Sequence, residues 1–307
     1  MSLIVVGTMA FDAIETPFAK INQVVGGSAT YVAYAASNFK QPIYQVSIVG
    51  SDFPEEEMAQ LRERGVQLEG VKVIPNKKSF FWSGRYHMDM NSRDTLVTDL
   101  NVLLDFDPEL PASYQNAEYL MLGNLDPKIQ MKVIRQMKRR PKLIVMDTMN
   151  FWMESTPKEL AEVLTMVDVL MVNDSEARQL STQFSLVKAA REIMKMGPKY
   201  LIIKKGEHGA LLFHKDQVFF APALPLEEVF DPTGAGDTFA GGFIGHIART
   251  NDISFENMKT GIIVGSAMAS YCVEKFGPER LKEVTRADID SRIQQFVNLV
   301  NFDIELV

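Results

Sequence analysis

Cysteine is almost absent from this chain of 307 residues, which has one, Cys272. A single thiol excludes an intramolecular disulfide and a zinc site built on cysteines. Cys272 lies in the apolar segment 265–273, which favours a small buried side chain. The four histidines do not recur at the spacing of metal ligands, so we expect them to be structural or surface residues.

Excess positive charge and long hydrophobic runs are also missing. The net charge is -7 and the isoelectric point is about 5.3, unlike the basic footprint of a nucleic-acid-binding protein. The first apolar run, residues 3–6, is too short for a signal peptide or a membrane span. We therefore expect a cytoplasmic protein with neither nucleic acid nor membrane as partner. A hydrophobic fraction of 46% is ample for a packed core.

Short apolar runs alternate with helical patterns along most of the chain. The pattern predicts strands at 3–6, 43–49, 119–122, 143–147, 169–172 and 200–204, and helices at 28–39, 54–64, 127–139, 157–166 and 186–196. Such alternation is typical of a mainly parallel sheet with helices on both faces. The prediction is one α/β domain that spans residues 1–307.

Two stretches interrupt this rhythm, at about 13–25 and 71–104. The second contains the aromatic and hydroxyl-rich run 79–86, which is typical of antiparallel strands. We predict a small β element inserted in the α/β domain as a lid over the active site. The alternative is a simple extension of the sheet edge. An aromatic sheet face of this kind can also pair with its copy, which predicts a homodimer through the lid.

The strongest chemical signal is the segment 231–243, DPTGAGDTFAGGF. A turn rich in glycine and proline leads into a helix predicted to begin near Ala235. The first amides of a helix have no partners within the helix, so they form an anion site. Gly234, Ala235 and Gly236 would line this site, and Asp237 beside it would accept a proton from an attacking hydroxyl. The alternative for Asp237 is a capping carboxylate.

This segment resembles the C-terminal signature of the ribokinase-type (PfkB) carbohydrate kinase family, and further motifs extend the resemblance over the whole chain. The resemblance implies a ribokinase-like three-layer sandwich and an ATP- and Mg²⁺-dependent kinase. Members phosphorylate a hydroxyl, often a hydroxymethyl, of sugars, sugar phosphates or nucleosides. The resemblance makes Asp237 the catalytic base and places Gly234, Ala235 and Gly236 in the anion hole.

The acceptor site is predicted from the first part of the chain. Gly26-Gly27 matches the Gly-Gly substrate motif of the family, and Asp12 matches its hydroxyl-binding aspartate. A carboxylate accepts two hydroxyl protons at once, which suits a vicinal diol. Tyr31 stands where many members have asparagine, and its ring could stack on a base or a sugar. Asn124 follows another strand end, within reach of substrate or phosphates. Taken alone, the glycine pair would indicate only a turn.

Two further motifs predict the nucleotide site. Asn173 and Glu176 match the family's N-x-x-E motif, which implies a role in holding Mg²⁺ through water; a helix cap is the alternative. Lys204, Gly206 and Gly209 match its K-x-G-x-x-G segment, which contacts the nucleotide; a tight turn between strands at 201–204 and 210–214 is compatible with that role. The chain contains no Walker A loop.

The remaining assignments concern cations and substrate choice. Asp147 ends a buried strand and is a weak candidate for the site. The resemblance also makes Asp231 and Thr233 candidates for a monovalent-cation site, with K⁺ as the ion. We predict transfer of the γ-phosphate of ATP to a hydroxymethyl group of a sugar. A nucleoside is the alternative acceptor, because Tyr31, Trp82 and Tyr86 could stack on a base and segment 86–91 resembles the flap of some nucleoside kinases. A non-catalytic nucleotide-binding regulator is a third hypothesis.

Overall fold

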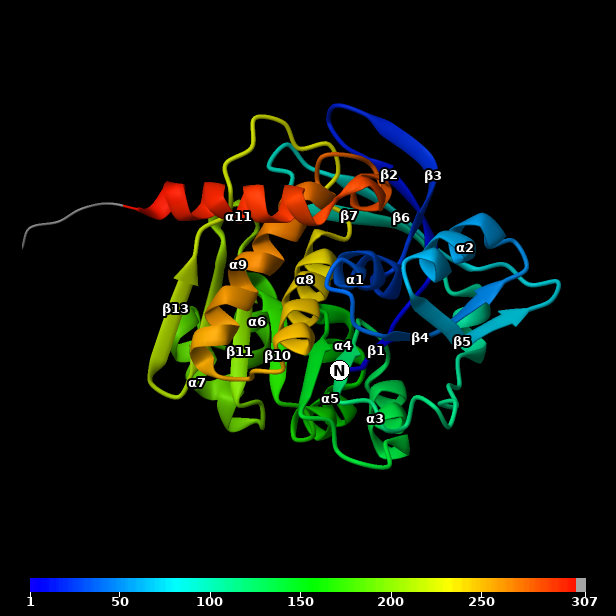
Figure 1. The fold of residues 1–307 in the computed structure, drawn as a ribbon, viewed down its shortest axis with the longest axis horizontal. Coiled ribbons are helices and arrows are strands. Elements are labelled where there is room, and N and C mark those ends of the chain that lie inside the picture. The colour runs from blue at the N-terminus through cyan, green and yellow to red at the C-terminus, as the bar shows by residue number, and fades with distance from the viewer. Residues whose placement is uncertain (302–307) are drawn as a thin grey trace, which may run out of the picture.

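The computed structural model describes residues 1–301, and its centre is a sheet of nine strands (Figure 1). Seven strands run parallel, and β12 and β13 are added antiparallel at one edge. In spatial order the strands are β13 (Gln217–Ala221), β12 (Ala210–His214), β11 (Tyr200–Lys204), β10 (Val169–Asn173), β9 (Leu143–Asp147), β8 (Tyr119–Leu122), β1 (Leu3–Val6), β4 (Ile43–Gly50) and β5 (Val66–Ile74).

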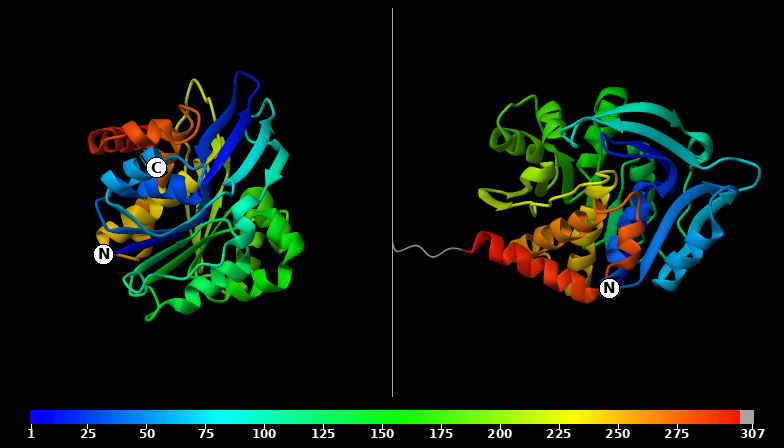
Figure 2. Two further views of the ribbon diagram at one scale, coloured as in Figure 1. Left: turned by 90° about the vertical axis from the view of Figure 1, so that its right-hand side faces the viewer. Right: turned by 90° about the horizontal axis from the view of Figure 1, so that it is seen from above.

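Helices cover both faces of this sheet, so the domain has three layers (Figure 2). One face carries α1 (Ser28–Ser37), α2 (Glu55–Glu63), α8 (Ala235–Thr250), α9 (Phe255–Cys272), α10 (Glu279–Glu283) and α11 (Arg286–Val300). The other carries α3 (Pro127–Gln136), α4 (Asn150–Ser155), α5 (Pro157–Leu164), α6 (Asp174–Ser181) and α7 (Leu186–Lys195). Strand β1 shows why: Leu3 and Val5 enter one core while Ile4 and Val6 enter the other.

The predicted mainly parallel α/β sheet is confirmed, as are all six strands expected from apolar runs. The predicted helices form as well, although several end two or three residues earlier than expected. Helix α3, for example, ends at Gln136, before the basic run that begins at Lys138.

A second sheet of four strands forms the lid, in the order β3 (Lys20–Gly26), β2 (Ala10–Glu15), β6 (Phe80–Tyr86) and β7 (Arg93–Asp99). Its pairs are antiparallel except for the parallel pair β2 and β6. The observed bounds differ from the expected 13–25 and 71–104: the first hairpin begins at Ala10, and residues 71–74 belong to β5 of the large sheet. Strand β5 is an edge strand of the large sheet and carries several exposed residues, so its sequence does not show the continuous apolar run of the buried strands.

The lid sheet stands at the carboxyl ends of the parallel strands. Strand β2 follows β1 after a few residues, and β3 leads directly into α1 through Gly27. The hairpin of β6 and β7 lies beside β2 at the top of the view in Figure 1. At the tip of the lid, Asn91 lies against Gly206, which follows the end of β11. Among residues 1–301, no helix is long and apolar enough to span a membrane.

Candidate active site

Helix α8 begins with two unpaired backbone amides. Gly234 caps the helix in the left-handed region, with φ 75°, and a side chain there would overlap the ring of Tyr31. The amide of Ala235 donates to Pro232 O at 3.2 Å. Within residues 1–301, the amides of Gly236 and Asp237 have no such acceptor. The amides of Gly236 and Asp237 are thus the two at this helix end without an acceptor; of the predicted residues Gly234, Ala235 and Gly236, only Gly236 contributes one of them.

A positive charge lies at the same place. Lys204, at the end of β11, brings Nζ to 3.0 Å from the position of a Cβ on Gly236. Its Nζ also donates to Asp147 Oδ2 at 2.8 Å, at the end of β9. Burial disfavours the ammonium form, but Asp147 and Glu176 overcome this effect and raise the pKa of Lys204. Lys204 is therefore a fixed cation beside the free amides, where phosphate oxygens gain most.

Asp237 lies in the first turn of α8 with its carboxylate partly accessible. Desolvation and, next, the negative charge of Asp147 raise its pKa to about 7, while Lys204 and Arg93 act in the opposite direction. A carboxylate with a pKa near neutrality is a better proton acceptor than an ordinary aspartate. The position and pKa suit a general base, and no side-chain cap is formed at this helix end.

Asn173 and Glu176 form a reciprocal cap at the start of α6. Glu176 N donates to Asn173 Oδ1, and Asn173 N donates to Glu176 Oε2, both at 2.7 Å. The helix-cap alternative is thus observed. Burial and then Asp147 raise the pKa of Glu176 to about 7, so this carboxylate lies where added positive charge would be stabilising.

The acceptor motifs meet each other directly. Asp12 of β2 is buried, and its carboxylate lies against Gly26, where any side chain on Gly26 would overlap Asp12 Oδ2. Gly27 has φ 95° and packs against Thr8 O. Burial and then Asp231 and Asp237 raise the pKa of Asp12 to about 8. The sequence correctly places Asp12, Gly26 and Gly27 together, and the packing explains why glycine occupies both positions.

Tyr31 does not present its ring to a ligand. It is only 1% exposed, its ring packs under Gly234, and its hydroxyl has no partner among residues 1–301. Burial and then Asp231 and Asp12 raise its pKa well above the usual value. The ring therefore supports the anion-hole loop, and stacking on a base, which the sequence suggested, has no exposed face to use.

The side chain of Asn124, expected to face substrate or phosphates, is bonded to residues at the start of α4. Its Nδ2 donates to Met149 Sδ, and Trp152 Nε1 donates to its Oδ1 at 2.8 Å. Both ends of the amide are occupied, which leaves less capacity for substrate than the sequence suggested.

The K-x-G-x-x-G segment forms the tight turn between β11 and β12 that the sequence predicted. Gly206 and Gly209 both have positive φ, at 54° and 82°. A side chain on Gly206 would overlap Asn91 at the tip of the lid, so the lid reaches this loop. The sequence gave no signal for that contact between segments far apart in the chain.

The loop before α8 is fixed by the segment that follows α9. Asp231 is fully buried and accepts from Thr233 N at 2.8 Å and from Gly277 N at 3.0 Å. Burial raises its pKa to about 6, against the effect of these hydrogen bonds. Cys272, buried as expected, donates to Thr233 O. The candidate cation residues Asp231 and Thr233 are therefore brought together by the chain itself.

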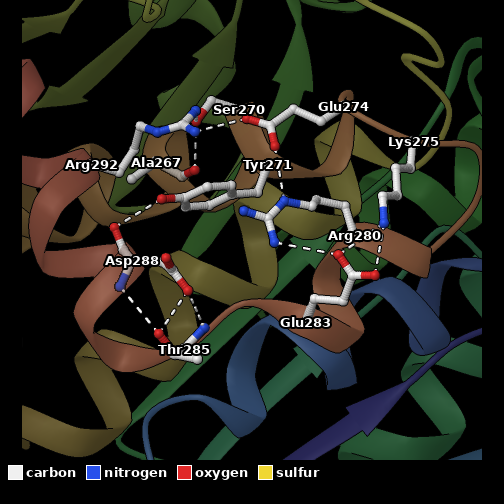
Figure 3. A network of polar contacts seen from close by, with 10 residues as sticks. All are labelled: Ala267, Ser270, Tyr271, Glu274, Lys275, Arg280, Glu283, Thr285, Asp288 and Arg292. Atoms are coloured by element: carbon white, nitrogen blue, oxygen red, sulfur yellow. Dashed lines mark hydrogen bonds and ion pairs between the residues drawn. The ribbon is translucent and has the colours of Figure 1, made fainter.

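An arginine network holds this segment in place (Figure 3). Glu274 accepts from Arg292 at 2.7 Å and from Arg280 at 2.9 Å. The ring of Tyr271 lies between the two guanidinium groups, 3.9 Å from Arg292 and 5.0 Å from Arg280. Helices α9, α10 and α11 are thereby joined next to Val273, whose carbonyl accepts from Phe230 N and Asp231 N.

The lid also contacts the anion-hole loop. The hydroxyl of Thr233 donates to Tyr86 Oη at 3.0 Å, and Tyr86 is buried. Its pKa is raised to about 12, chiefly by burial. The Tyr86 ring is thus committed to this contact, and of the three aromatic residues considered for stacking only Trp82 keeps accessible surface.

The arrangement fits a magnesium–nucleotide complex. Among residues 1–301, no group of three His, Cys, Asp or Glu side chains is placed to hold a metal alone. Mg²⁺ usually keeps several waters and takes one or two carboxylates together with substrate phosphates. Glu176 and Asp147 are two carboxylates at this place, and the charge of Asp147, which pairs with Lys204, contributes to the raised pKa of Glu176.

Comparison with known proteins agrees with this geometry. Residues 2–284 match the pfkB family carbohydrate kinase. The cytidine kinase of Thermococcus kodakarensis is 29% identical over 81% of this chain and 89% of its own length. A nucleoside kinase of Methanothermobacter thermautotrophicus is 26% identical over 90% of this chain and 91% of its own.

Solved structures share the fold. A nucleoside kinase of Burkholderia thailandensis in complex with inosine has a TM-score of 0.77, with 22% identity over 96% of this chain and 99% of its own. The ribokinase of Arabidopsis thaliana, complexed with ribose and ATP, has a TM-score of 0.76 and 19% identity, over 95% of this chain and 98% of its own. The ribokinase-like three-layer fold with a β lid is thereby confirmed.

Fold, site and comparisons define an ATP-dependent small-molecule kinase. The chain belongs to the pfkB family of carbohydrate kinases, as the sequence motifs indicated. Kinases of this family use ATP with Mg²⁺ and act on small-molecule sugars or nucleosides.

Proposed function

We propose that this kinase transfers the γ-phosphate of ATP to the hydroxymethyl group of a nucleoside, with Asp237 as the base. The observation that carries the choice of acceptor is the register of the lid, which pairs Asp12 with Trp82. Side chains of paired residues in neighbouring strands point to the same face. A ribose whose hydroxyls bind Asp12 would therefore place its base beside the indole of Trp82.

The relatives support this acceptor. The first two similar proteins are named cytidine kinase and nucleoside kinase, and one similar structure contains inosine. Sugar kinases also occur among the relatives, and the diol that Asp12 would bind is common to ribose and ribonucleosides. A sugar is thus the competing acceptor, and only the contact with Trp82 separates the two.

The proposed reaction is an in-line displacement. The acceptor oxygen forms its bond to the γ-phosphorus as the bond between this phosphorus and the β-γ bridging oxygen breaks, and ADP leaves. Asp237 takes the hydroxyl proton. The amides of Gly236 and Asp237 and the Lys204 ammonium receive the phosphoryl oxygens. Asn173, Lys204, Gly206 and Gly209 form the nucleotide side in this proposal.

Two ions belong to the proposal. Mg²⁺ would be held through water by Glu176, with Asn173 fixing that carboxylate in its cap, and would neutralise phosphate charge. A monovalent cation, K⁺, would lie beside Asp231 and Thr233, where burial has raised the pKa of Asp231 and a positive charge would be stabilising.

Association through the lid is a further part of the proposal. All seven residues of β7 are exposed, including the apolar Leu96 and Val97, and Leu100 and Leu104, which follow β7 in the sequence, are exposed as well. A second copy of the chain would cover this edge strand. Light scattering of the wild type against Leu96→Lys tests the dimer: the variant should be monomeric, and a wild-type monomer would reject it.

The test of the acceptor is ATP consumption with a panel of purine and pyrimidine nucleosides, ribose and sugar phosphates, with Mg²⁺ and with or without K⁺. The expected result is a KM for one nucleoside far below that for ribose. Trp82→Ala should raise the KM for the nucleoside at least tenfold and leave that for ribose unchanged. A sugar as preferred acceptor, indifferent to Trp82, would replace the nucleoside in this account.

A further inference from the structure

A buried glutamine bridges two strand ends of the large sheet behind the site. Gln130 lies in the first turn of α3, where its amide nitrogen donates to Asp126 O at 3.1 Å, and it is 0% exposed. Its Nε2 donates to Gly123 O at 2.9 Å and to Asp147 O at 3.1 Å. Only the amino end of an amide can face two carbonyl oxygens, so these contacts fix the orientation of the side chain.

The bridge stands where β8 and β9 stop pairing. The parallel register of these two strands ends with Leu122 opposite Met146. Gly123 and Asp147 are the next residue of each strand, and the two N–H groups of Gln130 Nε2 bind one carbonyl of each. The side chain of Gln130 therefore holds the two main chains together one position beyond the end of their ladder.

The two bridged residues lead to different halves of the site. A side chain on Gly123 would lie 2.7 Å from Ser28 Oγ, and Ser28 directly follows the glycine pair of the acceptor motif. Asp147 accepts from Lys204 Nζ at 2.8 Å, and its charge is one cause of the raised pKa of Asp237. One amide thus connects the main chain behind the acceptor glycines with the carboxylate that holds the phosphate-binding cation.

We propose that Gln130 is a positioning residue that sets the spacing between the acceptor and nucleotide halves of the active site. Because its side chain is fully buried, it acts through Gly123 and Asp147. In-line transfer needs the acceptor oxygen aligned with the phosphorus and the leaving oxygen, and a misplacement of about 1 Å costs on the order of a hundredfold in rate. Each half keeps its own contacts without the bridge, so each substrate would still bind. The proposal rests on the kinase reaction proposed above and holds for a nucleoside or a sugar acceptor.

Gln136, the last residue of the same helix, provides a matched control. Its Nε2 donates to Pro108 O at 3.0 Å and its Oε1 accepts from Leu110 N at 2.7 Å, so it also ties α3 to the main chain, but in the segment before β8. The test compares kcat for Gln130→Met, Gln130→Asn and Gln136→Met with saturating ATP and acceptor. Methionine keeps the length of the side chain without its N–H groups, and asparagine keeps the amide but is one methylene too short to reach both carbonyls.

Both Gln130 variants should lose at least about tenfold in kcat, whereas Gln136→Met should stay within about threefold of the wild type. Acceptor KM should change little in all three variants. The Gln130 variants should also form more ADP per phosphorylated product than the wild type does, because water replaces an acceptor oxygen that no longer faces the γ-phosphorus.

Nucleotide binding separates a displaced site from a loss of folded protein. Titration with a non-hydrolysable ATP analogue needs no acceptor, and both Gln130 variants should bind one analogue per chain with a Kd within about threefold of that of the wild type. The nucleoside proposal is tested by the acceptor preference of the wild type alone, which this comparison of variants does not use. A kcat in both Gln130 variants equal to that of Gln136→Met would overturn the assignment. So would a loss of kcat that is matched by fewer binding sites per chain, or by an equal rise in Kd or KM.

Discussion

The hydroxyl of Thr233 donates a 3.0 Å hydrogen bond to Tyr86 Oη, which joins the anion-hole loop to the lid across 147 positions of the sequence. The Tyr86 side of this contact is buried, and Thr233 is itself fixed by its amide hydrogen bond to Asp231. Lid position and catalytic-loop position are therefore coupled through one pair of side chains.

Removing that hydrogen bond should loosen the closed lid. Tyr86→Phe keeps the ring and leaves the Thr233 hydroxyl without its acceptor, which typically costs about 1–3 kcal/mol at a buried site. We expect a higher acceptor KM and a larger fraction of ATP hydrolysed by water, measured as ADP formed per phosphorylated product. A coupling ratio that stays at one would show that this hydroxyl does not hold the lid.

Asp12 should make the free enzyme less stable as pH rises. The pKa of Asp12 is about 8 in the folded chain, against 3.8 for an ordinary aspartate in the unfolded chain. The folded state therefore binds more protons than the unfolded state between these two pH values. Stability from this group is full below pH 3.8 and is lost as pH rises through 8. Asp12→Asn should therefore raise the melting temperature more at pH 8 than at pH 5, while it weakens acceptor binding. An equal change at both pH values would contradict the raised pKa.

The variant Tyr31→Phe tests whether Tyr31 only supports the anion-hole loop or also binds the acceptor. The Tyr31 hydroxyl is buried without a partner in the described chain, and such a group costs free energy of desolvation. The variant should be at least as stable as the wild type, with an acceptor KM within about threefold, the range of a change that removes no contact. A large rise in KM without loss of stability would return Tyr31 to the acceptor site.

The sequence predicted the main sheet and the start of helix α8 well, because both depend on local signals. Apolar runs define strands such as β1 and β8, and the glycines of segment 231–243 mark a helix start with free amides. The Asp12–Gly26 contact was inferable from the family pattern alone. Other pairings between distant segments were not: nothing local links Lys204 to Asp147 or Asn91 to Gly206. Trp82 and Tyr86 looked alike in sequence, and only the structure separates them: Tyr86 is buried and bonded to Thr233, whereas Trp82 keeps accessible surface.

Activity should depend on pH through Asp237, which must be deprotonated to accept the hydroxyl proton. Its pKa is raised to about 7, chiefly by burial, so kcat/KM should rise with pH and level off above an apparent pKa near 7. Glu176, also near 7, interacts with it, so the profile reports the group of carboxylates together. A kcat/KM that does not change between about pH 5 and pH 8 would exclude a catalytic base with a pKa of about 7.

The most direct measurement is the turnover of Asp237→Asn beside the wild type, with the preferred acceptor, ATP and Mg²⁺. The variant should fold, bind ATP and lose at least about a hundredfold in kcat, since general-base catalysis contributes about 10²–10⁴. A variant within about threefold of the wild type would remove Asp237 from its role as the base. A wild type that turns over no acceptor in the panel would instead favour a nucleotide-binding regulator.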